Sequence, residues 1–286
     1  MAKSMNQMKC GVFVVTCCLL FAPVACSQTG DQFFDSNGIK IRYLVAGHGN
    51  PVILIHAFGM SAEMWGPVIT DLSRDHQVIA MDCRGHGHSG KPHEPAQYGI
   101  EMVNDVMRLM GHLGIKQAHI IGYSMGGSIA LKMLTEHPDR FRTAVIGGSL
   151  GFRATDVDET PKLGPNLMSG MPFSEAMIAS APPGWPAPSP QQREMMKRMD
   201  AAQDSRALGA ETVSHEGLWV DDEKLRAVKV PTLVLYGEHD QPARYEEAKR
   251  QLPNMEFKMI AGAGHGPASQ SPEFLKDVRE FLARQP

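Results

Sequence analysis

The sequence predicts an α/β protein with a mostly parallel sheet, an antiparallel hairpin before it and an inserted cap. Short uninterrupted apolar runs alternate with helical stretches, which is typical of a parallel sheet with helices on both faces. This alternation stops between residues 150 and 229. With 286 residues, of which 43% are hydrophobic, the chain has enough apolar material for one such domain with an insertion.

The hairpin is indicated by Asn37-Gly38, a dipeptide typical of two-residue turns, which separates the strand-like segments 33–35 and 39–43. Apolar runs without polar alternation are typical of strands buried on both faces, as parallel strands are. Such runs predict strands at 52–55, 78–81, 119–121, 144–146, 232–236 and 255–260. Helical spacing of apolar residues predicts helices at 62–72, 101–113, 125–136, 244–251 and 272–284.

The segment 150–229 contains eight prolines and six methionines. Its PPGWP run at 182–186 cannot continue a helix. Because a structureless loop of this length is rare in a compact domain, we expect a cap of short helices and loops. The sheet-forming core is then divided between residues 27–149 and 230–286.

Residues 1–26 have the pattern of an export signal. Lys3 and Lys9, without any acidic residue, precede the uncharged run 11–25, which is shorter than the roughly 20 residues of a spanning helix. The Ala25-Cys26 junction resembles the lipobox of bacterial lipoproteins, so membrane anchoring through a lipidated Cys26 is one prediction. Cleavage after Ser27 and an uncleaved anchor are the alternatives. An exported chain would be periplasmic, secreted or a membrane-anchored lipoprotein.

Charge and composition exclude several classes of protein. Lys and Arg total 28 and Asp and Glu total 31, a net charge of −3 that does not favour nucleic acid as a partner. Only Cys83 lies beyond residue 26, so no disulfide framework is expected. No phosphate-binding glycine motif follows the first apolar strand and no metal-ligand cluster is evident, so we expect neither cofactor nor metal.

The strongest chemical signal is the GYSMG segment at 122–126, a G-x-S-x-G pattern between an apolar run and a helical one. Small residues on either side of Ser124 allow a sharp turn from strand to helix, which lifts the hydroxyl clear of the backbone. In this context the pattern predicts a nucleophilic serine. A glycine-rich turn with a capping serine is the alternative.

A serine hydroxyl needs a base, and the base needs an acid to fix its tautomer. His265 lies among glycines after the last predicted strand, and Asp240 follows the strand before it. Either residue alone would be an ordinary loop residue. In the order Ser124, Asp240, His265, with the cap between the first two, they predict a catalytic triad.

The oxyanion of an acyl transfer needs preorganised N–H donors. We expect one from the backbone of Met125, directly after the nucleophile, and one from the backbone of Phe58. Phe58 lies in the HAFGM segment at 56–60, which follows the first apolar strand. His56 is expected to support this loop and not to act as a base.

Residues 33–284 resemble the α/β-hydrolase fold, in its capped, esterase-like serine hydrolase branch. The matching segments are HAFG at 56–59, DCRGHGHS at 82–89, GYSMGG at 122–127, GEHD at 237–240 and Gly264-His265. The resemblance implies that Asp82 and Arg84 are structural partners below the site. Ala57 departs from the pattern, since glycine is usual there. Related branches that cleave carbon–halogen bonds or open epoxides use an aspartate nucleophile, and Ser124 argues against both.

The predicted function is therefore hydrolysis of carboxylic esters or lactones through an acyl-enzyme, as in carboxylesterases. Phe173, Trp185 and Trp219 in the cap, with its methionines, indicate small to medium, fairly apolar substrates. The resemblance also allows hydrolysis of carbon–carbon bonds or amides, perhydrolysis, or a ligand receptor with a vestigial triad. The sequence leaves the oligomeric state open.

Overall fold

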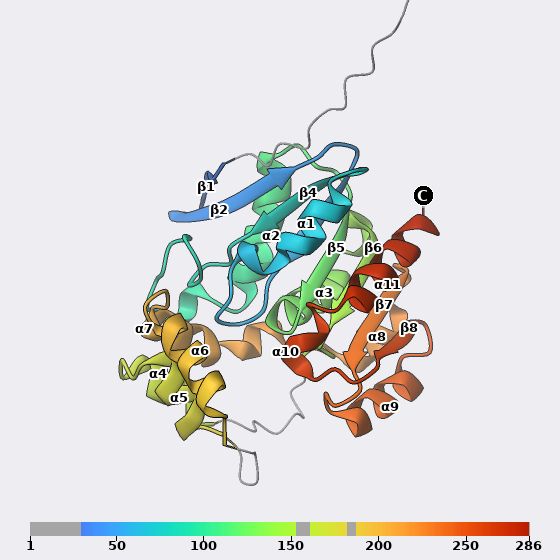
Figure 1. The fold of residues 1–286 in the computed structure, drawn as a ribbon. Helices are drawn as coiled ribbons and strands as arrows, with labels where there is room; N and C mark the ends of the chain where they lie inside the picture. The colour runs from blue at the N-terminus through green and yellow to red at the C-terminus, as the bar shows by residue number, and fades with distance from the viewer. Residues whose placement is uncertain (1–29, 153–160, 182–186, 286) are drawn as a thin grey trace, which may run out of the picture.

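The computed structural model describes residues 30–152, 161–181 and 187–285, which form one sheet flanked by helices (Figure 1). Eight strands follow the order β1-β2-β4-β3-β5-β6-β7-β8. Their bounds are β1 Gln32–Ser36, β2 Ile39–Ala46, β3 Asn50–Ile55, β4 His76–Met81, β5 Ala118–Tyr123, β6 Phe141–Gly147, β7 Thr232–Gly237 and β8 Glu256–Ile260. The pairs β1–β2 and β2–β4 are antiparallel and all others are parallel, which confirms the predicted fold class.

The N-terminal hairpin turns where its dipeptide predicted. Asn37 and Gly38 both have positive φ, 56° and 85°, as a tight two-residue hairpin turn requires. The N–H of Gly38 donates to the Asp35 carboxylate at 3.0 Å. The turn therefore sets the register in which Ser36 pairs with Ile39.

Helices cover both faces of the sheet. On one face lie α2 (Ile100–His112), α3 (Met125–Glu136) and α9 (Pro242–Gln251); on the other lie α1 (Gly66–Leu72) and α11 (Pro272–Ala283), in front of the strands in Figure 1. Successive residues of β3 alternate between the two cores, since Ile53 packs on one side and Leu54 on the other. Burial on both faces explains why the strands are continuous apolar runs.

The predicted insertion divides into two parts. Its helices α4 (Leu163–Met168), α5 (Phe173–Ala179), α6 (Pro190–Asp200) and α7 (Ser205–Thr212) gather at one side of the sheet (Figure 1) and include a small apolar cluster of their own. Helix α8 (Asp222–Ala227) instead packs on α3, where Lys224 lies 3.4 Å from the Glu136 carboxylate. We call α4 to α7 the cap.

The predicted export signal at 1–26, with Cys26, lies outside the described residues and stays a prediction. Within residues 30–152, 161–181 and 187–285, none of the helices has the length and apolar character needed to cross a bilayer.

His119 is a buried titratable group near the start of β5. Its Nδ1 lies 2.8 Å from the Thr143 hydroxyl, and its Nε2 has no hydrogen-bond partner among the described residues. Burial, reinforced by His76 and Arg142 nearby, lowers the pKa of His119 from 6.5 to about 4. As the pH falls, His119 binds a proton in the unfolded chain at a higher pH than in the folded chain, so protonation favours unfolding. The contribution of neutral His119 to the free energy of unfolding is therefore complete above about pH 6.5 and is lost toward pH 4.

We therefore expect acidification from pH 6.5 to 4.5 to destabilise the wild type by about 2 kcal/mol more than His119→Gln, which cannot titrate. Urea unfolding at several pH values measures the difference. The matched control is His48→Gln, a change at an exposed histidine, which should retain the wild-type pH dependence. Equal pH dependence in wild type and His119→Gln would contradict the assignment.

Candidate active site

Ser124 lies at a sharp turn between β5 and α3. Its backbone has φ 53° and ψ −114°, a left-handed conformation that is strained for a residue with a side chain. The turn is held because the Ser124 N–H donates to the carbonyl of Gly147 at 2.8 Å and its carbonyl accepts from Ser128 at 3.0 Å. The strained turn presents the hydroxyl at the start of a helix, as the sequence predicted for a nucleophile.

Two glycines allow this turn to pack against the sheet. A Cβ on Gly122 would lie 2.1 Å from the carbonyl oxygen of Gly126. A Cβ on Gly126 would lie 2.1 Å from the carbonyl oxygen of Ile55, at the end of β3. Helix α3 therefore starts in direct contact with the segment that leads to Phe58.

The structure brings the three predicted triad residues together in one hydrogen-bonded series. His265 Nε2 lies 3.0 Å from the Ser124 hydroxyl, and His265 Nδ1 lies 2.8 Å from the Asp240 carboxylate. The carboxylate only accepts, so Nδ1 carries the proton and Nε2 can take the one from Ser124. His265 begins the single-turn helix α10 (His265–Ala268), where the sequence predicted an open loop.

Tyr123 holds the segment that carries His265, a contact that sequence reasoning missed. Its hydroxyl donates to the backbone carbonyl of His265, and its ring lies 5.7 Å from the imidazole. Burial and the nearby Asp240 raise the pKa of Tyr123 well above its usual value, so the hydroxyl stays protonated as a donor. In the sequence, the only local indication of this contact is the aromatic residue directly before Ser124.

The predicted oxyanion donors lie on adjoining segments. Met125 is the first residue of α3, and its N–H has no intrahelical acceptor. Phe58 lies in the loop after β3, and no acceptor for the N–H of Phe58 or Met125 occurs in the part of the chain that the structure describes. The cap contacts this loop, because the Gln203 side chain donates to the carbonyl of Gly59 at 2.6 Å. The donor roles of Phe58 and Met125 stay predictions.

His56 supports the same loop from below. The N–H of Cys83 donates to His56 Nε2 at 3.0 Å, so the ring proton is on Nδ1 and is donated to the carbonyl of Ala57 at 2.8 Å. Burial lowers the pKa of His56, which keeps the ring neutral. With both nitrogens bound to backbone, His56 has the structural place that the sequence indicated.

Asp82 and Arg84 also act as structural partners. The Asp82 carboxylate accepts from the N–H groups of Ala62 at 2.7 Å and His88 at 2.8 Å. Arg84 forms a two-point ion pair with the buried Asp105, at 2.7 and 2.6 Å. Neither side chain has a hydrogen bond to Ser124, Asp240 or His265 in the described structure.

A cavity of about 200 Å³ opens beside Ser124 and His265. Phe173 and Trp219, expected to line the substrate pocket, do not contribute to its walls. Phe173 packs in the apolar cluster of the cap, and its ring centroid lies 6.0 Å from that of Phe58. Trp219 is 37% exposed. Trp185 lies outside the described residues. The apolar residues of the predicted insertion that line the described cavity are instead Leu150 and Phe152.

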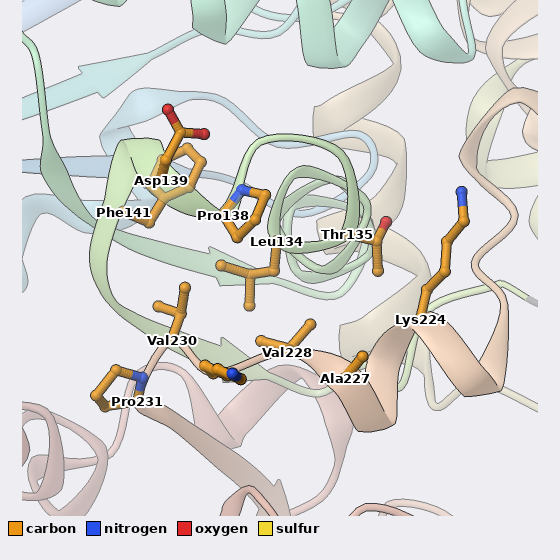
Figure 2. Close-up of a pocket in the computed structure, with 11 residues that line it drawn as sticks. Leu134, Thr135, Pro138, Asp139, Phe141, Lys224, Ala227, Val228, Val230 and Pro231 are labelled. Atoms are coloured by element: carbon orange, nitrogen blue, oxygen red, sulfur yellow. The ribbon is translucent and has the colours of Figure 1, made fainter.

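A larger groove of about 590 Å³ lies at the other end of α3 (Figure 2). Figure 2 shows Leu134, Val228 and Val230 pointing toward one another between α3 and the segment that enters β7. Helix α3 has 12 residues, which at about 1.5 Å per residue separates its two ends by roughly 18 Å. The groove is thus remote from Ser124, and its lining includes none of the three triad residues.

Residues 50–179 match the family model described as alpha/beta hydrolase fold. The chain has the α/β-hydrolase fold. It is 29% identical to a 2-hydroxy-6-oxo-6-(2'-aminophenyl)hexa-2,4-dienoic acid hydrolase of Metapseudomonas resinovorans, over 89% of this chain and 91% of that protein.

Two solved structures share the fold of this α/β hydrolase. One is a carboxylesterase structure from Nitrososphaera gargenis, with TM-score 0.74 and 22% identity over 88% of this chain and 98% of that one. The other is the enol-lactonase from Burkholderia xenovorans LB400, with TM-score 0.73 and 24% identity over 88% and 100% of the two chains.

We expect Tyr123→Phe to lower kcat for hydrolysis about 3- to 10-fold and to leave KM unchanged, because one hydrogen bond to the His265 backbone is lost while the ring packing remains. Steady-state kinetics measure both constants. Tyr98→Phe is the matched control, since its buried hydroxyl also donates to a backbone carbonyl, that of Pro92 at 2.7 Å, away from the triad. A similar loss of kcat in both variants would show a general effect on folding.

Proposed function

We propose that this α/β hydrolase is a serine hydrolase of carboxylic esters or lactones that works through an acyl-enzyme. The observation that carries the proposal is the series of hydrogen bonds from Asp240 through His265 to Ser124, at 2.8 and 3.0 Å. Nucleophile, base and orienting acid within hydrogen-bond reach form the arrangement that activates a serine hydroxyl.

In the proposed reaction, the Ser124 oxygen attacks the substrate carbonyl carbon while its proton passes to His265 Nε2. The N–H groups of Met125 and Phe58 stabilise the negative oxygen of the tetrahedral intermediate. The imidazolium then donates the proton to the departing alcohol oxygen, and the acyl group stays on Ser124. A water molecule, deprotonated by His265, attacks the acyl-enzyme and releases the acid.

Hydrolysis of a carbon–carbon bond is the second candidate. The relative from Metapseudomonas resinovorans is named for hydrolysis of a 2-hydroxy-6-oxo-dienoic acid, and the homologues include carbon–carbon bond hydrolases. The same series of side chains would serve both reactions, so the fold and the triad do not separate them. The leaving group distinguishes them, because a carbanion must be protonated in place of an alkoxide.

We expect Ser124→Ala to abolish hydrolysis of 4-nitrophenyl esters and Asp240→Asn to lower kcat by about 10³- to 10⁴-fold, because the asparagine cannot hold His265 in the required tautomer. Initial rates with acyl chains of increasing length provide the measurement. Ser169→Ala, a change at an exposed serine of the cap, is the control and should keep the wild-type rate.

Wild-type activity in Ser124→Ala would refute the triad. A small effect of Asp240→Asn would transfer the orienting role to another acid such as Glu238, although the Glu238 carboxylate accepts from the N–H of Gly262 at 2.7 Å. If folded wild type releases no 4-nitrophenol from any ester but cleaves a 2-hydroxy-6-oxo-dienoic acid, the second candidate replaces the first.

A further inference from the structure

One polar side chain of the cap reaches the loop of Phe58. The Gln203 amide, between α6 and α7, donates to the carbonyl of Gly59 at 2.6 Å, although the two residues are 144 positions apart in the chain. The amide oxygen of Gln203 is buried and has no hydrogen-bond partner among residues 30–152, 161–181 and 187–285. Because burial of an unpaired oxygen costs free energy, packing alone would favour an apolar side chain here. The bond to Gly59 is what the amide contributes.

This bond continues through two peptide units of the loop. A trans peptide is planar, with its carbonyl and its N–H pointing in opposite directions. The carbonyl of Gly59 and the N–H of Met60 belong to one peptide, and that N–H donates to the carbonyl of Ala57 at 3.0 Å. The carbonyl of Ala57 and the N–H of Phe58 belong to another. Two hydrogen bonds in series therefore connect the Gln203 amide to the peptide that carries the Phe58 N–H.

The free end of this series is the N–H that we expect to bind the oxyanion. No acceptor for the Phe58 N–H occurs within the described part of the chain. Hydrogen bonds in a series polarise one another, which makes the last donor stronger. The bond from Gln203 thus bears on both the direction of the Phe58 N–H and its strength as a donor.

The core holds the other end of the same turn. His56 Nδ1 donates to the carbonyl of Ala57 at 2.8 Å, and the centroid of the Phe58 ring lies 5.7 Å from that of His86. These contacts remain when the bond from the cap is lost. Removal of the Gln203 donor should therefore loosen the turn without unfolding it.

We propose that Gln203 is a positioning residue of the oxyanion site. By binding the carbonyl of Gly59, it orients and polarises the Phe58 N–H toward the negative oxygen of the tetrahedral intermediate. This inference rests on the proposed function, because Ser124 must form that intermediate. Gln203 does not line the cavity beside Ser124, so it acts through the backbone of the loop and not by contact with substrate in that cavity.

The first test is Gln203→Met, which keeps the length of the side chain and removes the donor. Loss of a whole oxyanion donor costs about 10²- to 10³-fold in kcat, and Gln203 acts on one donor indirectly. We therefore expect kcat to fall about 5- to 30-fold and KM to stay within about twofold in steady-state kinetics with a 4-nitrophenyl ester. Gln191→Met makes the same change at an exposed position of the cap and should keep the wild-type kcat.

A second control separates positioning of the loop from attachment of the cap. Asp204, the neighbour of Gln203, lies 3.0 Å from His93 Nε2, and His93 belongs to the core outside the loop of Phe58. This pair is largely exposed, so His93→Ala should leave kcat within about twofold of the wild type.

A pair of ketone inhibitors gives a measurement that a general loss of structure would not reproduce. The Ser124 oxygen adds to the carbonyl carbon of a trifluoromethyl ketone, its proton passes to His265, and the carbonyl oxygen becomes an oxyanion. The matching methyl ketone is less electrophilic and serves as the ground-state analogue. Gln203→Met should raise the Ki of the trifluoromethyl ketone by the factor by which kcat/KM falls, and leave the Ki of the methyl ketone unchanged.

Four results would overturn the inference. They are an unchanged kcat in Gln203→Met, a rise in KM alone, an equal loss of kcat in His93→Ala, and equal weakening of both inhibitors.

Failure of the proposed function has a different result, because the wild type then hydrolyses no ester or Ser124→Ala keeps its activity. Amide hydrogen exchange still tests the contact in that case. Faster exchange of the Met60 N–H in Gln203→Met would support the positioning of the loop by Gln203, and unchanged exchange would overturn it.

Discussion

The close approach of α3 to the end of β3 is the constraint on which the site depends. Gly126 lies so near the carbonyl of Ile55 that no side chain fits between them. This contact forces the left-handed turn at Ser124 and places the first N–H of the helix beside the loop of Phe58. Nucleophile and predicted oxyanion donors are therefore fixed by one backbone contact, before any substrate binds.

The acid and the base reach Ser124 as a unit. The loops after β7 and β8 are bonded to each other, since the N–H of Glu238 donates to Ile260 at 3.0 Å and the N–H of His239 donates to Ala263 at 2.9 Å. These bonds set Asp240 relative to His265 independently of β5. The Tyr123 hydroxyl then connects the unit to the strand that carries Ser124. A single tyrosine next to the nucleophile can thereby affect the Ser124–His265 distance without touching substrate.

The strands and the turn at Ser124 could be predicted because their signals are local, whereas Asp240 and His265 were indicated only by their order after Ser124 along the chain. Burial on both sheet faces leaves continuous apolar runs, and a serine turn between strand and helix needs glycines at fixed positions. The contacts of Tyr123 and Gln203 could not be predicted, because they join residues far apart in the chain without any repeated pattern. The cap residues misled for a related reason. The composition of an insertion does not say which side chains face the cavity, and Phe173 packs against Phe58 and within the cap.

The cap and the core then contribute differently to the proposed reaction. The cap contacts the loop of Phe58. The Gln203 side chain donates to the carbonyl of Gly59, and a Cβ on Gly59 would lie 3.0 Å from the Phe173 ring. Cap movements would consequently change the position of the Phe58 N–H more directly than the cavity beside Ser124. The described walls of that cavity belong to α3 and the turn before it, to β7, α9 and α10, and to the segments that follow β6 and β7, which the hydrogen-bonded sheet holds in place. Changes in the cap should therefore act mainly through the position of the Phe58 N–H, and changes in the core segments through the shape of the cavity.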